Sequence, residues 1–292
     1  MSETIHFFAF GLGYSAAAIA RALKKDAAWI GGTVRNVEKA VALAGEGLNA
    51  LIFDGKAAGV GVAEGVRHAT HLLVSVPPGA ADPVLAVHRD SILAAEHLRW
   101  IGYLSTVGVY GNYGGAWVTE ATTPHPTPGR STERLAAERA WKAVAEERKL
   151  PLAIFRLAGI YGPGRNAFTG LADGTARRIV KPGQVFNRIH VDDIAQTAVA
   201  AIAANAEGVF NVTDDEPAPA ADVTAFAAGL MGVAPPPEVP IEAAELSPMA
   251  RSFYAENKRV ANRRIKEELG VTLRYRTYRE GLTALWREGT WR

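Results

Sequence analysis

Phe7–Ala16 reads FFAFGLGYSA, and the architecture of the chain can be worked out from it. An apolar run, Ile5–Phe10, ends at two glycines, Gly11 and Gly13. A segment rich in small residues, 16–23, follows without a break. This succession is typical of a strand, a tight glycine turn and a helix.

A strand–glycine–helix unit suits a dinucleotide phosphate for a physical reason. Gly11 permits the turn, Gly13 lets the backbone approach a pyrophosphate, and the small Ala16 lets helix and strand pack closely. The start of the helix, at Tyr14 and Ser15, offers unpaired N–H groups to the phosphates. These five residues are the predicted phosphate loop. The alternative is an ordinary glycine-rich turn in an α/β protein that binds no nucleotide.

The composition indicates an ordinary globular protein. The chain has 292 residues, of which 48% are hydrophobic and 21% charged. Its net charge is +2 and it has no long basic run, so a nucleic-acid partner gains no support. There is no cysteine, and the seven histidines show no metal-ligand spacing, so no metal is expected. Without a signal-peptide pattern or an apolar run of membrane-spanning length, we expect a cytoplasmic protein with no membrane partner.

Apolar runs alternate with helical segments along most of the chain. After the first strand, the predicted strands are 29–34, 50–53, 71–76, 100–105, 151–157 and 208–212. The predicted helices include 37–44, 82–98, 131–149, a helix ending at 204, and 222–230. This alternation predicts an α/β fold with a doubly wound parallel sheet of the Rossmann type. Asp192 or Asp193 is expected to cap the helix that ends at Ala204, and 59–65 to form a loop or a poor helix.

The residue after the second predicted strand indicates the cofactor. An NAD-preferring site has an acid there, which binds the ribose 2′-hydroxyl. This chain has Arg35 instead. Because a guanidinium can pair with a 2′-phosphate, NADP is favoured over NAD. The alternative is a solvated surface arginine.

Four further stretches resemble the extended branch of the short-chain dehydrogenase/reductase superfamily. They are LSTVGVYG at 104–111, RLAGIYGPGR at 156–165, RIHVDDIA at 188–195 and ENKRVANRRIKEELG at 256–270. Members of that branch are NAD(P)-dependent epimerases, dehydratases and reductases. The resemblance implies a Rossmann domain over 1–165 and 189–212. It also implies a small C-terminal substrate lobe over 166–188 and 213–292, with the active site between the two.

The resemblance also implies roles for single residues. Thr106 falls where the family keeps a Ser or Thr that hydrogen-bonds the substrate oxygen. Asp54 matches the acid that contacts the adenine. The other implied cofactor contacts are Ser75, Val76 and Pro77, and, beside the nicotinamide, Ala158, Gly159 and Ile160.

The family's catalytic Tyr-x-x-x-Lys pair is missing from its expected helix. The register of that helix puts Arg130 on the tyrosine position and Arg134 on the lysine position. An arginine is always protonated, so Arg130 cannot serve as an ordinary proton donor. The pattern resembles atypical subgroups that keep the fold and lose the pair. Tyr254 and Lys258 have the same spacing, but they lie in the C-terminal lobe, and we interpret them as a coincidence.

Arg130 and Arg134 stand one helical turn apart and therefore share a face. Two guanidiniums on one face suit a carboxylate or a phosphate, which predicts a small anionic substrate or an anionic effector. Together with Thr106 they form the predicted catalytic set. The alternative is that one or both bind cofactor phosphate, or pair with Glu133 or Glu138 at the surface.

Four other side chains could move a proton. Tyr110 and Tyr161 are expected to be packing residues with a polar tip. His190 is expected to be structural, and His125 to be a solvated loop residue.

Two classes of function remain open. The first is an NADP-dependent oxidoreductase or epimerase that acts on a carbonyl or hydroxyl carbon of a small polar substrate. The second, favoured by the loss of the pair, is a non-catalytic NADP sensor. A homodimer through 82–98 and 131–149 is also expected, with Trp100 and Trp141 either in the contact or in the core.

Overall fold

A parallel sheet of seven strands forms the centre of the computed structural model, which describes residues 4–292. Its strand order is β11-β7-β5-β4-β1-β2-β3. The strands are β1 (Ile5–Phe10), β2 (Ala27–Val34), β3 (Asn49–Ile52), β4 (His71–Val74), β5 (Trp100–Thr106), β7 (Leu152–Leu157) and β11 (Gly208–Val212). The order reverses between β1 and β4, which is the switch point where Rossmann folds bind dinucleotides. The predicted doubly wound α/β fold is confirmed.

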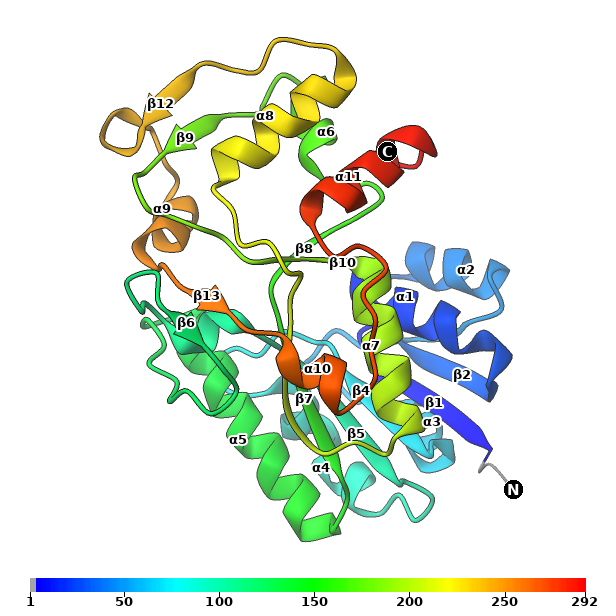
Figure 1. The fold of residues 1–292 in the computed structure, drawn as a ribbon. Helices are drawn as coiled ribbons and strands as arrows, with labels where there is room; N and C mark the ends of the chain where they lie inside the picture. The colour runs from blue at the N-terminus through cyan, green and yellow to red at the C-terminus, as the bar shows by residue number, and fades with distance from the viewer. Residues whose placement is uncertain (1–3) are drawn as a thin grey trace.

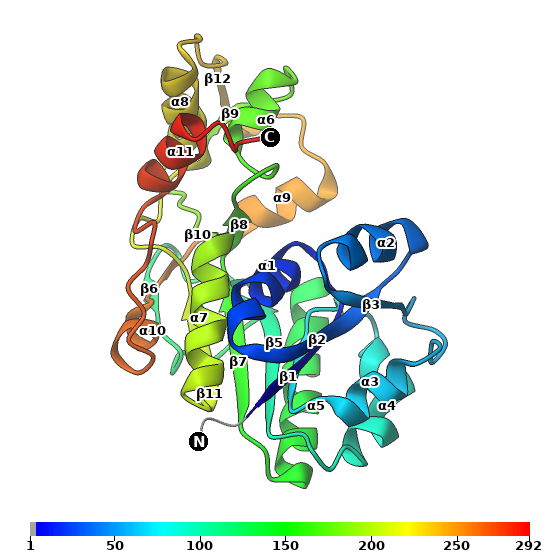
Figure 2. The same cartoon turned by 90° about the vertical axis from the view of Figure 1, so that its right-hand side faces the viewer.

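Helices cover both faces of this sheet (Figures 1 and 2). One face carries α1 (Tyr14–Ala22), α2 (Val37–Gly45) and α7 (Val191–Ala203). The other carries α3 (Val62–His68), α4 (Pro83–Leu93) and α5 (Arg130–Arg148). Each layer buries its own apolar cluster against the sheet, so β1 from Phe7 to Phe10 and β4 from Leu72 to Val74 are apolar.

Two local expectations were wrong, and a third agrees with the structure. The segment 59–65, expected to be a loop or a poor helix, is non-helical over 59–61 and then begins the short helix α3. Helix α4 ends at Leu93, whereas the prediction ran to Leu98; Ala95 and Leu98 are buried but lie outside the helix. The cap of α7 is His190, whose side chain accepts the Asp192 N–H at 3.2 Å.

A small lobe lies above the carboxyl edge of the sheet in Figures 1 and 2. Its elements are α6 (Ala167–Ala172), β9 (Arg178–Val180), α8 (Ala220–Met231), β12 (Glu238–Pro240), η3 (Ile241–Ala243), α9 (Pro248–Ala255) and α11 (Tyr278–Arg287). Phe168, Tyr278 and Leu282 form its core. Strands β9 and β12 pair with each other, far from the main sheet.

Two short strand pairs connect this lobe with the sheet. β8 (Gly159–Tyr161) pairs with β10 (Arg188–His190), and β6 (Trp117–Val118) pairs with β13 (Arg259–Val260). The remaining short elements are η1 (Leu23–Lys25), η2 (Val107–Tyr110) and α10 (Arg263–Glu267). Ile265 of α10 is buried beside β11, although its position falls within the range expected for the lobe.

The two tryptophans considered for a dimer contact are core residues. Trp100 and Trp141 are each 0% exposed. The indole N–H of Trp141 donates to Asp82 at 3.0 Å, and that of Trp100 donates to the Ala206 carbonyl at 3.0 Å. Neither ring can therefore contribute to a contact between two copies.

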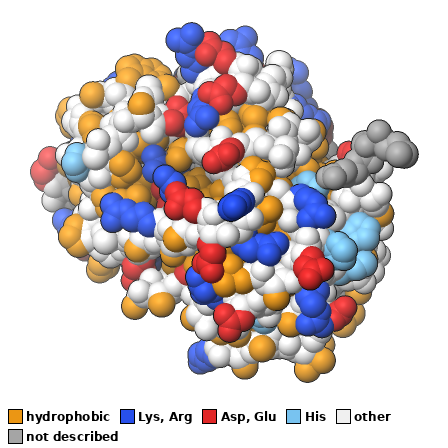
Figure 3. Space-filling view, turned by 90° about the horizontal axis from the view of Figure 1, so that it is seen from below, with side chains coloured by type: hydrophobic (Ala, Val, Ile, Leu, Met, Phe, Trp, Pro, Cys, Tyr) orange, Lys and Arg blue, Asp and Glu red, His pale blue; other side chains and the backbone are white. Residues whose placement is uncertain are grey.

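Lys, Arg, Asp and Glu side chains are interspersed on the face seen from below in Figure 3. Within residues 4–292, no helix is both long and apolar enough to span a bilayer. The same residues contain no cluster of three or more His, Asp or Glu side chains that could hold a metal ion.

Candidate active site

The predicted cofactor residues follow the ends of parallel strands and so form a row along one edge of the sheet. Across the strand order, the row runs from Ala158 after β7, through Thr106 on β5 and Ser75 after β4, to Gly11 after β1. It continues past β2 and β3 to the residues that follow those strands. Neighbouring strands lie about 4.8 Å apart, so the row extends over roughly 25 Å.

The glycine loop is held in place by Thr33 of β2. The Gly11 N–H donates to Thr33 Oγ1 at 2.9 Å, and the Leu12 N–H donates to the Thr33 carbonyl at 2.7 Å. The Gly13 N–H is taken up by the Gly11 carbonyl at 2.7 Å. The loop amides are thus occupied, and the first-turn amides of α1 remain for a ligand. Sequence reasoning missed Thr33, whose partner lies 22 residues away.

Gly11 needs to be glycine because of its backbone and its neighbour. Its φ is +87°, and a Cβ there would come within 3.0 Å of Val76 Cγ2. The loops after β1 and β4 therefore touch at the switch point, as a dinucleotide site requires. The α1 turn carries no acidic residue that would repel a phosphate.

Cationic side chains flank the far end of the row. Arg35 is exposed directly after β2, and Lys39 follows on the first turn of α2. Neither forms an ion pair with a carboxylate in the part of the chain that the structure describes. Asp54 is exposed, and two backbone N–H groups, of Lys56 and Ala57, hold its pKa below the usual range.

Tyr14 links the phosphate loop to the stretch RLAGIYGPGR. Its hydroxyl donates to the Pro163 carbonyl at 2.9 Å, and a Cβ on Gly162 would lie 2.6 Å from that hydroxyl. Burial raises the pKa of Tyr14, and the nearby Arg165 guanidinium opposes this rise. Arg165 is a further cation near the amino end of α1 that sequence reasoning did not assign.

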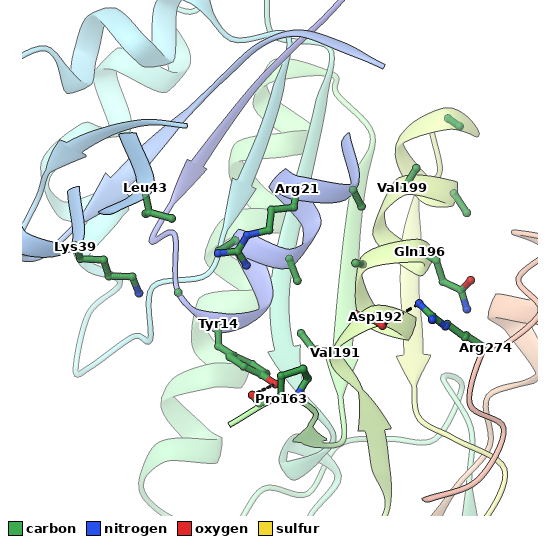
Figure 4. Close-up of a pocket in the computed structure, with 17 residues that line it drawn as sticks. Tyr14, Arg21, Lys39, Leu43, Pro163, Val191, Asp192, Gln196, Val199 and Arg274 are labelled. Atoms are coloured by element: carbon green, nitrogen blue, oxygen red, sulfur yellow. Dashed lines mark hydrogen bonds and ion pairs between the residues drawn. The ribbon is translucent and has the colours of Figure 1, made fainter. Parts of the chain in front are cut away.

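A groove of about 920 Å³ runs along the outside of α1 and α7 (Figure 4). Small side chains line most of it, with Arg21, Lys39 and an Asp192–Arg274 ion pair of 3.3 Å at its borders. Only Gly13 and Tyr14 of the predicted cofactor residues reach it. This groove is therefore not the row of strand ends described above.

Two hydroxyl groups meet beside Gly108. Thr106 Oγ1 accepts the Gly108 N–H at 3.1 Å. A Cβ on Gly108 would lie 3.3 Å from Thr106 Oγ1 and 2.9 Å from Ser131 Oγ. Thr106 and Ser131, from β5 and the first turn of α5, thus border one small space. Sequence reasoning missed Ser131, for which only its position beside Arg130 gave a signal.

The two predicted arginines extend in different directions from α5. Arg134 is half-buried, and its Nη1 donates to the Leu104 carbonyl at 2.8 Å and to the Tyr103 hydroxyl at 3.2 Å. Arg130 is exposed, and its Nη1 lies 3.7 Å from the Met249 Sδ of α9. Since Leu104 lies two residues before Thr106, these bonds fix Arg134 against the strand that carries Thr106.

The alternative of surface ion pairs on α5 does not hold. Glu138 is buried and bonds Arg156 through two hydrogen bonds, of 2.8 and 3.1 Å. It also accepts the Ser105 hydroxyl at 2.5 Å. Among residues 4–292, neither Arg130 nor Arg134 pairs with a carboxylate. Glu138 instead connects α5 to β5 and β7, the strands that end at the site.

Three of the four other proton-transfer candidates are held in structural contacts. Tyr110 is buried and donates to Asn211 at 2.8 Å, and burial raises its pKa. Burial also raises the pKa of Tyr161, whose hydroxyl is packed against Gly281. His190 caps α7, and burial lowers its pKa to about 4. His125 is exposed in the loop before α5.

The pair Tyr254 and Lys258 is not arranged as a catalytic pair. The Lys258 Nζ donates to the Gly111 carbonyl at 2.8 Å and to Glu256 at 2.7 Å. The Tyr254 ring packs edge-on against Phe186, with ring centres 5.1 Å apart.

Comparisons with known proteins agree with the fold. The model of the NAD dependent epimerase/dehydratase family matches residues 90–213. A Streptomyces protein named 3-diazoavenalumate denitrifying reductase is 33% identical over 173 residues. That alignment covers 54% of each chain, so this chain matches about half the length of its curated relative.

Two solved structures are similar over nearly the whole chain. A conserved protein of unknown function from Silicibacter pomeroyi is 49% identical, with a TM-score of 0.87 and coverage of 97% of this chain and 98% of that one. UDP-glucuronic acid 4-epimerase from Bacillus cereus, solved in complex with NAD, is 17% identical, with a TM-score of 0.75 and coverage of 96% and 95%. The second likeness shows the fold alone. With its Rossmann-type sheet and the motifs after its strands, the chain belongs to the NAD-dependent epimerase/dehydratase family of the extended short-chain dehydrogenases/reductases.

Proposed function

We propose that this chain is an NADP-dependent oxidoreductase that reduces a small anionic substrate at the carboxyl edge of its sheet. The observation that carries the proposal is the row of predicted residues after six parallel strands, with the first-turn amides of α1 near its middle. Arg35 stands at one end of this row, and Thr106 with Arg134 near the other.

The residues present fit a dinucleotide phosphate. The amides of Tyr14, Ser15 and Ala16 have no intrahelical partner, and the glycine loop leaves no Cβ between them and the switch point. Arg35 and Lys39 would bind a 2′-phosphate, which an acid at the same place would repel. When bound, the nicotinamide group would supply the hydride.

The chain's own residues would hold and polarise the substrate. The Thr106 hydroxyl would donate to the reacting oxygen, since its lone pairs already accept the Gly108 N–H. The fixed Arg134 guanidinium would stabilise negative charge that develops there. Because Arg130 cannot give up a proton, we infer that water protonates the oxygen.

A reduction is favoured over an epimerisation for one reason. Epimerisation by transient oxidation requires a base, and three of the four candidates, Tyr110, Tyr161 and His190, are held in structural contacts. The fourth, His125, is exposed in the loop before α5. The Streptomyces relative is itself named a reductase, which supports this preference.

A cofactor titration tests the proposal. Fluorescence titration should give tight binding of NADPH and at least tenfold weaker binding of NADH, a difference of about 1.4 kcal/mol. Loss of NADPH absorbance with a panel of small keto acids and aldehyde acids should then identify an acceptor. If neither NADPH nor NADH bound, the proposal would be overturned.

A non-catalytic NADP sensor is the second candidate, and the arginine at the tyrosine position favours it. It requires tight NADPH binding without oxidation by any acceptor. A protein captured only in the presence of NADPH would decide for the sensor, and turnover of any acceptor would decide against it.

A further inference from the structure

We propose that the anionic substrate carries a flat apolar body, as an aryl carboxylate does, and that helix α9 covers that body. The inference rests on the proposed function, because it takes Arg130 as the residue that binds the anionic group of the substrate. It adds the part of the substrate that Arg130 does not explain.

One face of helix α9 is apolar and exposed, because no other segment of the described chain covers it. Met249 and Phe253 stand one helical turn apart and therefore share a face. They are 51% and 60% exposed, and no residue of α9 is buried. Exposed large apolar side chains on one helix face indicate a surface that binds something.

This apolar face adjoins the predicted anion site. The Arg130 Nη1 lies 3.7 Å from the Met249 Sδ, so the guanidinium touches the face of α9 that carries both apolar side chains. Figure 1 shows α9 above the amino end of α5, on the side of the sheet where the strands end. A ligand held by Arg130 would therefore extend along Met249 and Phe253.

Helix α9 is fixed in this position at its carboxyl end. Lys181 donates to the Tyr254 carbonyl, and the Tyr254 ring packs edge-on against Phe186. Just after the helix, Glu256 accepts the Thr127 hydroxyl at 2.8 Å, which joins α9 to the loop before α5. Arg130 and the apolar face of α9 thus form one continuous surface, which is positive at one end and apolar along its length.

Binding to the NADP-saturated protein tests the inference with named probes. We expect 2-naphthoate to bind in calorimetric titrations, and 2-naphthamide and acetate to bind at least about tenfold more weakly. The amide lacks the charge and acetate lacks the apolar body. Met249→Ala with Phe253→Ala should weaken 2-naphthoate about tenfold, and Arg130→Gln should weaken it similarly.

Val233→Ala is the matched control. Val233 is 46% exposed in the same lobe, so its loss should leave naphthoate binding unchanged. Equal binding of naphthoate and naphthamide, or no effect of the paired α9 substitution, would overturn the inference while NADPH binding stays intact. Loss of NADPH binding itself would overturn the proposed function, and the inference with it.

Discussion

At the scale of single residues, the charge after β2 governs the expected cofactor preference. Arg35→Glu should weaken NADPH binding by roughly 10–100-fold, because a charged hydrogen bond of about 1.5–3 kcal/mol is replaced by repulsion. NADH binding should stay the same or improve, since a carboxylate can accept the ribose 2′-hydroxyl. Fluorescence titration of both cofactors measures the effect.

Arg139→Glu provides the control for the Arg35 prediction. Arg139 is an exposed residue of α5, and its substitution by Glu changes the net charge by the same amount. If both variants weakened NADPH equally, the effect would be one of net charge, and Arg35 would have no specific role.

A second residue-scale prediction concerns the buried ion pair between Glu138 and Arg156. These residues are 4% and 5% exposed. Glu138→Gln leaves a buried guanidinium without its counter-charge, so urea unfolding should show a loss of about 3–5 kcal/mol. Glu147→Gln breaks the exposed pair with Arg89 and should cost less than about 1 kcal/mol. Comparable losses in both variants would contradict the structural role of Glu138.

Single residues also show which features of the site the sequence alone does not predict. The positions of Gly11, Thr106 and Arg134 at strand ends or on a helix face could be predicted from local motifs, and their roles stay predictions. Thr33 and Ser131 could not, since their role depends on a neighbour that folding brings close.

At the scale of helices and strands, the packing of α11 against β8 depends on a glycine. A Cβ on Gly281 would lie 2.1 Å from the Tyr161 hydroxyl, so Gly281→Ala should destabilise the protein by about 1–3 kcal/mol. Tyr161→Ala removes that hydroxyl together with the ring atoms Cε2 and Cζ, which would lie 2.7 and 2.8 Å from the added Cβ. In the Tyr161→Ala background, Gly281→Ala should therefore cost much less in urea unfolding than it does in the wild-type background.

Gly229 of α8 is the control for this cycle. Nothing lies within 4 Å of a Cβ added there, so Gly229→Ala should stabilise the helix by up to about 1 kcal/mol. A loss at Gly281→Ala that is just as large in the Tyr161→Ala background would show that the clash is not the cause.

Elements differed in how well they could be predicted. The inner strands of the sheet are largely apolar runs because both faces are buried, and such runs are visible in the sequence. The edge strand β3 is partly exposed. The strands β6 and β13 have two residues each and pair across more than a hundred positions, so no local pattern reveals them. The cap of α7 was missed because the cap preferences favour Asp over His.

At the scale of the whole molecule, stability should depend on pH through groups buried between the sheet and the lobe. Burial raises the pKa of Asp214 to about 8, against the opposing effects of the Glu216 N–H and Arg188. Burial also raises the pKa of Asp193 to about 6, and lowers that of His190 to about 4. Asp193 and His190 change the pH dependence of stability below about pH 6.5. Of the three groups, Asp214 therefore governs it above that pH.

The sign of this dependence follows from proton binding. Folded Asp214 keeps its proton to higher pH than the unfolded chain, so its contribution is present at low pH and is lost as pH rises through about 8. Between about pH 6.5 and 8.5 the free energy of unfolding should fall, by at most about 1.4 kcal/mol per pH unit. Asp214→Asn should flatten this fall in urea unfolding at each pH, whereas Asp215→Asn should keep it. An unchanged slope in Asp214→Asn would assign the effect to another group.

The position of β11 at the edge of the sheet has a consequence for how the protein is made. β7 pairs with β5 on one side and with β11 on the other. β11 is synthesised only after residues 158–207, so β7 cannot complete its pairing until then. At roughly 5–20 residues per second, the ribosome needs on the order of seconds to supply it. During that interval the nascent chain presents an open, wholly apolar strand edge, LAIF at 152–155, of the kind that recruits strands from other chains. Translation pauses after residue 157 should therefore be the step at which this protein most needs a chaperone.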